Sequence, residues 1–122
     1  MVLVVGLVGL LVLRWVRPQW EELPVIAVDA SSDAEVLSVT IAHNDCGREP
    51  EIRVSGETAE TVVVQARHDV RGDCDDVGLQ TTAALALGAP LGERSIELSD
   101  DLPAASCVVD GAPSTRCRPS EP

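Results

Sequence analysis

The sequence predicts an all-β protein, a small antiparallel β-sandwich or barrel, preceded by an N-terminal transmembrane helix. Three observations predict it. Short segments of alternating apolar and polar residues recur beyond residue 20, and turn residues separate them at intervals of roughly 8–15 residues. No amphipathic pattern with the period of an α-helix occurs in that part of the chain. The first thirteen residues, by contrast, are uncharged and nearly all apolar.

The apolar start of the chain predicts a transmembrane anchor over residues 1–20. As a helix, its first thirteen residues would rise only about 20 Å, whereas the hydrocarbon core of a bilayer is about 30 Å thick. Continuing to residue 20 supplies the missing length with residues typical of a membrane interface, where arginines reach the headgroups and tryptophans lie among them. The predicted interface residues are Arg14, Trp15, Arg17 and Trp20.

Two features disagree about the side of the membrane on which the remaining chain lies. Arg14 and Arg17 follow the apolar segment, and by the positive-inside rule they would keep the downstream chain in the cytoplasm. The four cysteines favour an oxidising compartment instead. We give the cysteines more weight and predict a single-pass protein of the cell membrane with an extracytoplasmic domain. A basic segment upstream of Met1 would remove the conflict.

The segments after the anchor are expected to form strands in order. Residues 21–34 are predicted to be a stalk or linker, with a candidate first strand at 25–28. The β-domain is expected over residues 35–111, and its first strands are marked by the alternating apolar residues Leu37, Val39 and Ile41, then Ile52 and Val54.

The second half of the domain shows the same alternation. The longest strand candidate carries Val62, Val64 and Ala66 on one face. Residues 79–87 also fit a helix because of their alanines, but the flanking glycines and two threonines favour a strand. Two shorter strands are expected before residue 111, and residues 112–122 are predicted to be a Pro-rich tail.

The composition leaves the domain in need of covalent support. The chain has no Phe or Tyr, and both tryptophans precede residue 21, so the core must consist of aliphatic side chains. An even number of cysteines predicts two disulfides. The four cysteines can be paired in three ways. We favour the way in which Cys46–Cys74 joins two turns and Cys107–Cys117 pins the tail. A zinc site built from His43, Cys46, His68 and Cys74 is the rival interpretation, but its spacing is irregular.

The charge of the downstream chain excludes one class of partner. All 20 acids lie from Glu21 onward together with seven of the nine arginines, so this region carries 7 − 20 = −13. We therefore expect no nucleic-acid partner. The chain also has no lysine, which removes mechanisms that need a lysine base or Schiff base.

The acidic stretch ARHDVRGDCDDVG, residues 66–78, is a low-probability calcium site. Carboxylate oxygens are the ligands that calcium prefers, and an EF-hand pattern starting at Asp73 fails at Val77 and at Ala84, where the closing glutamate belongs. A looser site would use Asp69, Asp73, Asp75 and Asp76. The tripeptide Arg71–Asp73 matches an adhesion signal only by a short, common pattern. The alternative is a solvated acidic turn that contains Cys74.

No pattern points to catalysis. Motifs of serine and metal hydrolases and Gly-rich phosphate loops are absent from the sequence. His68 is in phase with the inward residues of its strand and is expected to be a buried structural histidine, while His43 begins a turn. The turn GAPLGER, residues 88–94, is expected to place Arg94 in water, with a binding loop as its functional interpretation. We therefore predict no enzyme, no catalytic residues and no cofactor.

The stretch from about Thr40 to Leu98 resembles a group of small exported or membrane-anchored actinobacterial proteins with no assigned activity. The resemblance rests on the turn at Cys46, the Cys74–Asp76 tripeptide and the APLGxR pattern that ends at Arg94. It covers about half of the chain. It implies an extracytoplasmic location and a first disulfide between Cys46 and Cys74, and it implies no activity.

The function expected from the sequence is that of a non-catalytic binding or structural module of the cell envelope. Its partners would be the membrane, through the N-terminal helix, and an envelope protein or cell-wall component that binds to loops or to a sheet edge. A domain that binds a divalent cation such as calcium is the alternative. A hydrolytic enzyme without a recognisable motif comes third.

Overall fold

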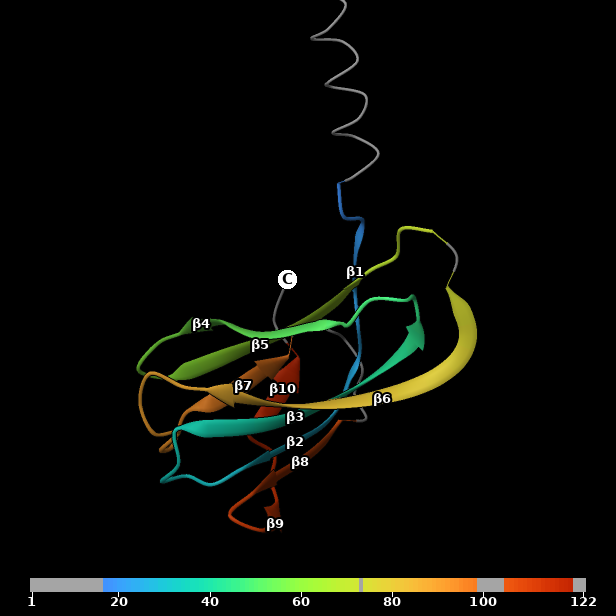
Figure 1. The fold of residues 1–122 in the computed structure, drawn as a ribbon. Helices are drawn as coiled ribbons and strands as arrows, with labels where there is room; N and C mark the ends of the chain where they lie inside the picture. Colours follow the sequence, from blue (N-terminus) through green and yellow to red (C-terminus); the bar gives the residue numbers. More distant parts are fainter. Residues whose placement is uncertain (1–16, 73, 99–104, 120–122) are drawn as a thin grey trace, which may run out of the picture.

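The computed structural model of this chain describes residues 17–72, 74–98 and 105–119, and this part of the chain folds into two sheets (Figure 1). Both sheets are five-stranded and mixed, containing parallel as well as antiparallel neighbours. No α-helix occurs in the described ranges. The all-β prediction is therefore confirmed, whereas the prediction of a purely antiparallel fold is wrong.

The first sheet is built around β5, the strand that runs through the centre of the domain. β5 pairs antiparallel with β4 along its length, antiparallel with β1 near its C-terminal end and parallel with β7 near its N-terminal end. β7 in turn pairs parallel with β10. The strands are β1 (Trp20–Glu22), β4 (Glu51–Glu57), β5 (Thr61–Asp69), β7 (Ser95–Leu98) and β10 (Cys117–Pro119).

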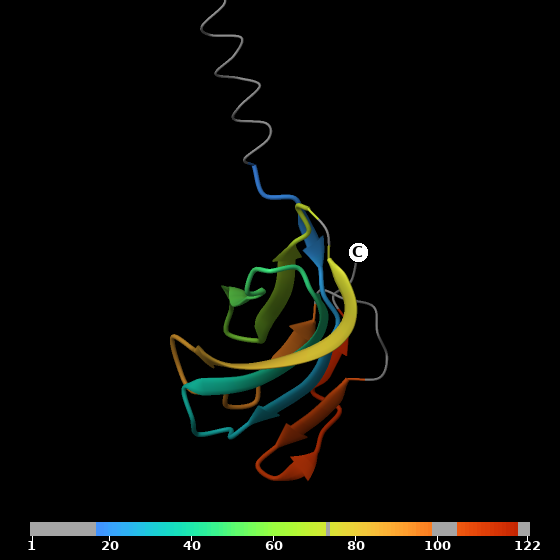
Figure 2. The ribbon, with the colours of Figure 1, turned by 45° about the vertical axis from the view of Figure 1, so that its right-hand side comes forward.

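The second sheet follows the order β6-β3-β2-β8-β9 and curls into a half-barrel (Figures 1 and 2). Its two longest strands, β3 and β6, form an antiparallel pair that bends around the domain, and β8 pairs parallel with β2. A register shift between Asn44 and Asp45 marks a bulge at the end of β3. The strands are β2 (Val25–Ala30), β3 (Val36–Asp45), β6 (Asp75–Ala86), β8 (Ser106–Val109) and β9 (Ala112–Pro113).

The core is aliphatic and draws on both sheets. Because side chains alternate between the two faces of a strand, β3 and β5 each bury every second residue. Of the inward residues predicted from the sequence, Ile52 and Val54 are only partly buried, and six are fully buried: Leu37, Val39, Ile41, Val62, Val64 and Ala66. Leu91 fills the same core from the turn after β6, although it belongs to no strand.

Two segments differ from the sequence prediction. Residues 21–34, expected to be a stalk with a candidate strand, contribute β1 and β2 and bury Leu23, Val25, Val28 and Ala30. Part of the expected tail forms β9 and β10. β2 contains the candidate strand at 25–28, whereas β1, β9 and β10 have only two or three residues, too few for alternation alone to reveal them.

The predicted anchor lies almost wholly outside the part that the structure describes, because only residues 17–20 of it belong to the described ranges. Among residues 17–72, 74–98 and 105–119, no helix has the length and apolar character needed to cross a membrane. Residues 17–19 are not helical and Trp20 begins β1, so the predicted helix does not extend to residue 20. For residues 1–16 the membrane helix stays a prediction.

Candidate functional site

Both favoured disulfides form. Cys46 is bonded to Cys74 with a Cα–Cα distance of 4.1 Å, and Cys107 to Cys117 with a Cα–Cα distance of 5.9 Å. All four cysteines of the chain are thereby bonded to one another, so none supplies the thiolate that a zinc site requires. Two disulfides in so small a domain indicate an oxidising environment outside the cytoplasm.

The acidic stretch contains a buried carboxylate where the sequence predicted a solvated turn. Asp69 is 5% exposed and accepts hydrogen bonds from the Gln19 and Arg71 backbone amides, both at 3.1 Å. The Arg71 guanidinium donates to its other oxygen at 2.8 Å, and Arg48 lies 3.7 Å away. Burial tends to raise the pKa of Asp69, but the hydrogen bonds from Arg71 and from the Gln19 amide outweigh it and lower the pKa from 3.8 to about 2.

This low pKa predicts a loss of stability in acid. A carboxyl group whose pKa is lower in the folded than in the unfolded chain stabilises the fold above the unfolded pKa, and its contribution disappears as pH falls toward the folded pKa. The contribution of Asp69 is therefore expected to be complete above about pH 5 and to be lost between about pH 4 and pH 2. The measurement is the urea midpoint of the wild type and of Asp69→Asn from pH 7 to pH 2.

The expected result is a lower midpoint for Asp69→Asn at neutral pH and a difference from the wild type that shrinks as pH approaches 2. Asp76→Asn, which changes an exposed aspartate on β6, is the control and should follow the wild type. A difference between Asp69→Asn and the wild type that is constant over this pH range would contradict the assignment.

The structure gives the calcium hypothesis no support. Asp69 is held by two arginines and two backbone amides, while Asp75 and Asp76 are exposed at the start of β6. Asp73 lies outside the described residues. Within the described ranges, no three side chains of the types that ligate metals gather into a group that could hold an ion.

The two histidines occupy different environments. His68 is 6% exposed, as its phase in the strand predicted, and its Nδ1 lies 3.6 Å from Cys46 Sγ. His43 is half-buried on the inward face of β3. Its Nδ1–H donates to the Asn44 carbonyl oxygen at 3.0 Å, which leaves Nε2 to accept from the Thr81 hydroxyl at 2.7 Å.

A groove of about 670 Å³ opens beside His43, between the end of β3, the start of β4 and the edge of β6. The lining combines apolar side chains, hydroxyls and a few charges: His43, Asp45, Gly47, Arg48, Glu49, Pro50, Ile52, Leu79, Thr81, Thr82 and Ala83. Leu79 and Leu85 point to the same face of β6, but Leu79 is 37% exposed and Leu85 only 9%. The inward face of β6 is therefore covered at one end and open at the other, where the groove lies.

The strand that borders this groove is an edge of its sheet. β6 pairs with β3 on one side, and no other described strand is bonded to it. From Val77 to Ala86 it carries no charge and no proline, and Val77 is 56% exposed. Beyond the two aspartates at its start, this edge therefore lacks the charged side chains and prolines with which proteins often block the addition of another strand.

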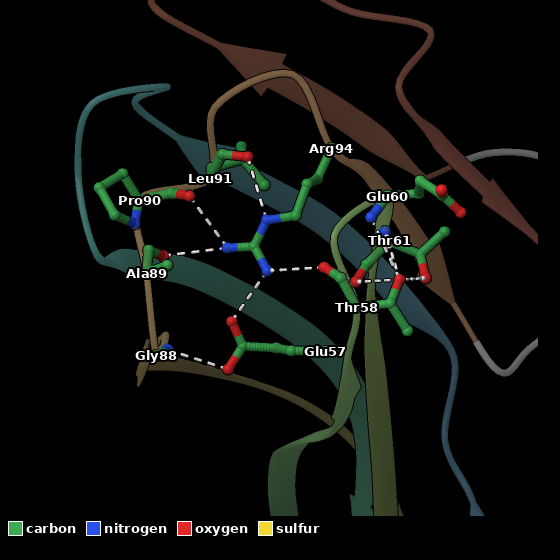
Figure 3. A network of polar contacts seen from close by, with 9 residues as sticks. All are labelled: Glu57, Thr58, Glu60, Thr61, Gly88, Ala89, Pro90, Leu91 and Arg94. Atoms are coloured by element: carbon green, nitrogen blue, oxygen red, sulfur yellow. Dashed lines mark hydrogen bonds and ion pairs between the residues drawn. The ribbon is translucent and has the colours of Figure 1, made fainter.

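The turn at residues 88–94 is tied into the fold by Arg94 (Figure 3). The Arg94 side chain is only 11% exposed, so its predicted position in water is wrong. Its guanidinium donates to the carbonyl oxygens of Ala89, Pro90 and Leu91 and binds Glu57 at 3.0 Å. The Gly88 amide and Arg94 together lower the pKa of Glu57. These contacts fix the turn to the end of β4.

The predicted membrane-interface residues are placed only in part. Arg14 and Trp15 lie outside the described ranges, and Arg17 is exposed just before β1. Trp20 is 43% exposed in β1, where its ring centroid lies 4.0 Å from the Arg67 guanidinium carbon. This contact gives Trp20 a role in joining β1 to β5, which sequence reasoning missed.

Comparison of this chain with protein-family models, curated proteins and solved structures finds no match. Its function therefore has to be inferred from the geometry of its own residues. The groove beside β6 and the cluster around the Cys46–Cys74 disulfide are the two arrangements that offer chemistry.

Proposed function

We propose that this chain is a membrane-anchored, extracytoplasmic β-domain that acts as a non-catalytic binding module of the cell envelope. The two disulfides support the location. The uncharged and nearly all apolar residues 1–13 support the anchor. β1 begins at Trp20 and pairs with β5, which fixes where the chain enters the domain. Two mixed sheets that pack around one core, with the second sheet only half closed, support a sandwich with one open side.

The groove beside β6 is the observation that carries the binding role. A strand edge with unpaired backbone groups lies next to a hollow lined by Ile52, Leu79 and Ala83. An extended polypeptide segment fits both features, because its backbone would pair with β6 while alternate side chains enter the groove. We propose a segment of a neighbouring envelope protein as the ligand.

The charge around the groove defines the segment further. Asp45 and Glu49 line the groove, and Asp75 and Asp76 lie at the start of the same strand. Arg48 is the cation of the lining, and it is paired with Asp69 and donates to the Arg71 carbonyl oxygen. A neutral or basic segment is therefore favoured over an acidic one.

The contact between His43 and Thr81 does not favour the hydrolase alternative. A catalytic base is usually oriented by a carboxylate, whereas a backbone carbonyl orients His43. The Thr81 hydroxyl is also a secondary alcohol held at a strand edge. The contact is better explained as one that fixes the wall of the groove between β3 and β6.

The test is selection of displayed random peptides on the full-length protein in detergent. We expect enriched peptides that alternate apolar with neutral or basic residues, and increased protection of the β6 amides from hydrogen exchange when a peptide binds. Leu79→Arg, which places a charge in the groove, should lower the affinity by about tenfold or more, equivalent to about 1.4 kcal/mol.

Val36→Arg is the matched control. Val36 is also an exposed aliphatic residue of the curled sheet, at 47%, but it is not part of the groove lining. The affinity of the Val36→Arg variant for the selected peptides should equal that of the wild type. Equal losses in the two variants, or protection confined to strands other than β6, would contradict the proposed site.

A further inference from the structure

We propose that the Cys46–Cys74 disulfide is a site of thiol–disulfide exchange, at which an external thiol attacks Cys74 and His68 stabilises Cys46 as the departing thiolate. This inference goes beyond the binding role proposed above. It rests on the environment of the two sulfur atoms, on their unequal exposure and on the charges that flank them.

His68 is oriented toward the sulfur of Cys46. A disulfide sulfur carries no hydrogen, so the 3.6 Å contact requires Nδ1–H of His68 to donate to Cys46 Sγ. The side chain is 7% exposed, and its Nε2 has no hydrogen-bond partner among the described residues. The Glu21 carboxylate lies 4.0 Å from Nε2. A buried donor is thus aimed at one sulfur, with a carboxylate behind the ring.

The two cysteine residues differ in exposure. Cys46 is 6% exposed, whereas Cys74 is half-buried in the loop before β6. Attack on a disulfide needs an approach to one sulfur in line with the bond that breaks, and the more exposed Cys74 offers it. Cys46 is then the leaving group. The donor of His68 is placed where negative charge develops, and a stabilised leaving thiolate departs faster.

The exchange step balances without a further reactant. The attacking thiolate forms a bond to Cys74 Sγ, and the electron pair of the Cys46–Cys74 bond moves to Cys46, giving one mixed disulfide and one thiolate. A second external thiolate can release Cys74 in the same way. The two external thiols are then joined in a disulfide, and both cysteines are reduced.

The flanking charges select the class of thiol. Asp45 precedes Cys46, Asp75 follows Cys74, and these two acids are opposite each other across β3 and β6. Glu21 faces His68, while the charge of Asp69 is compensated by Arg71 and Arg48. An anionic thiol is repelled by the uncompensated carboxylates, so a neutral or cationic thiol should react faster.

The second disulfide is an internal control. Like the first pair, it joins a buried cysteine, Cys107 at 7% exposure, to a half-buried one, Cys117. It lacks a histidine neighbour, because the other histidine of the chain, His43, is bonded to Thr81 and Asn44. A difference in reactivity between the two bonds therefore reports on His68 and its surroundings.

The experiment exposes the full-length protein in detergent, under native conditions, to cysteamine or mercaptoacetate at equal thiolate concentration. Samples are quenched and mapped by mass spectrometry. We expect the Cys46–Cys74 bond to open faster than Cys107–Cys117, with the first adduct on Cys74 and with cysteamine faster than mercaptoacetate. His68→Asn should slow opening of the first bond by about tenfold and leave the second unchanged.

Gln65→Asn changes a half-buried side chain on the opposite face of β5 from His68 and should leave both rates unchanged. Near-ultraviolet circular dichroism establishes that each variant is folded. If His68→Asn does not fold, the wild type still decides the question through the position of the first adduct and the ratio of the two rates. A first adduct on Cys46, equal opening rates of the two bonds, or an unchanged rate in folded His68→Asn would overturn the proposal.

Discussion

Replacing both Cys46 and Cys74 with alanine is expected to lower the free energy of unfolding by about 3.6 kcal/mol, the chain-entropy value for a loop closed by residues 28 apart. The bond joins the turn after β3 to the loop before β6, and removing it restores freedom to the unfolded chain between them. In a domain whose total stability is of order 5–15 kcal/mol, this is a large share. Urea unfolding without reductant measures it.

The double variant Cys107→Ala/Cys117→Ala is the natural comparison. Its cysteines are 10 residues apart, so the same relation predicts a smaller loss, about 2.7 kcal/mol. Both variants remove one buried and one half-buried sulfur, and this similarity leaves loop length as the main difference between them. A smaller loss for the Cys46 and Cys74 variant than for the Cys107 and Cys117 variant would contradict the expectation.

The central strands could be predicted from the sequence because their burial follows from the pleat alone. Leu37, Val39 and Ile41 alternate with less buried residues, and alternation is sufficient to identify the inward face. It carries no information about the direction of the neighbouring strand. The parallel pairs of β5 with β7 and of β2 with β8 therefore could not be predicted, since each unites segments that are distant in sequence.

The polar clusters were misplaced for a related reason. Asp69 lies among other acids in sequence and reads as solvated, but Gln19, fifty residues earlier, covers it and donates to it. Arg94 follows a Pro-Gly turn and reads as exposed, but Glu57 at the end of β4 binds it. In both cases a partner from another part of the chain helps to hold the side chain, and no local pattern indicates that partner.

The groove shows a subtler limit of sequence reasoning. His43 and Leu79 occupy inward positions of β3 and β6, and residues of this phase are expected in the core. They line a groove instead, because the curled sheet leaves the inward face of β6 uncovered near its start. Curvature is a property of the whole sheet, so the signal that marks core residues elsewhere marks the lining of an open groove here.

The absence of aromatic residues from the core leads to the second large expected effect. Ile96→Ala should lower the free energy of unfolding by about 3–4 kcal/mol, within the range for deletion of large buried aliphatic side chains. Ile96 is fully buried between Val62 on β5 and Cys117 on β10, and its amide donates to the Arg116 carbonyl oxygen at 2.9 Å. Because close-packed strands on both sides prevent collapse, the substitution should leave a cavity.

Two further variants separate packing from strand propensity. Ile96→Val keeps the β-branched shape and removes one methylene group, so its cost should be about 1 kcal/mol. Val77→Ala tests the same kind of change on the exposed edge strand β6, where Val77 is 56% exposed, and should cost less than about 0.5 kcal/mol. Comparable losses for Val77→Ala and Ile96→Ala in urea unfolding would mean that backbone preference, and not the aliphatic core, holds the two sheets together.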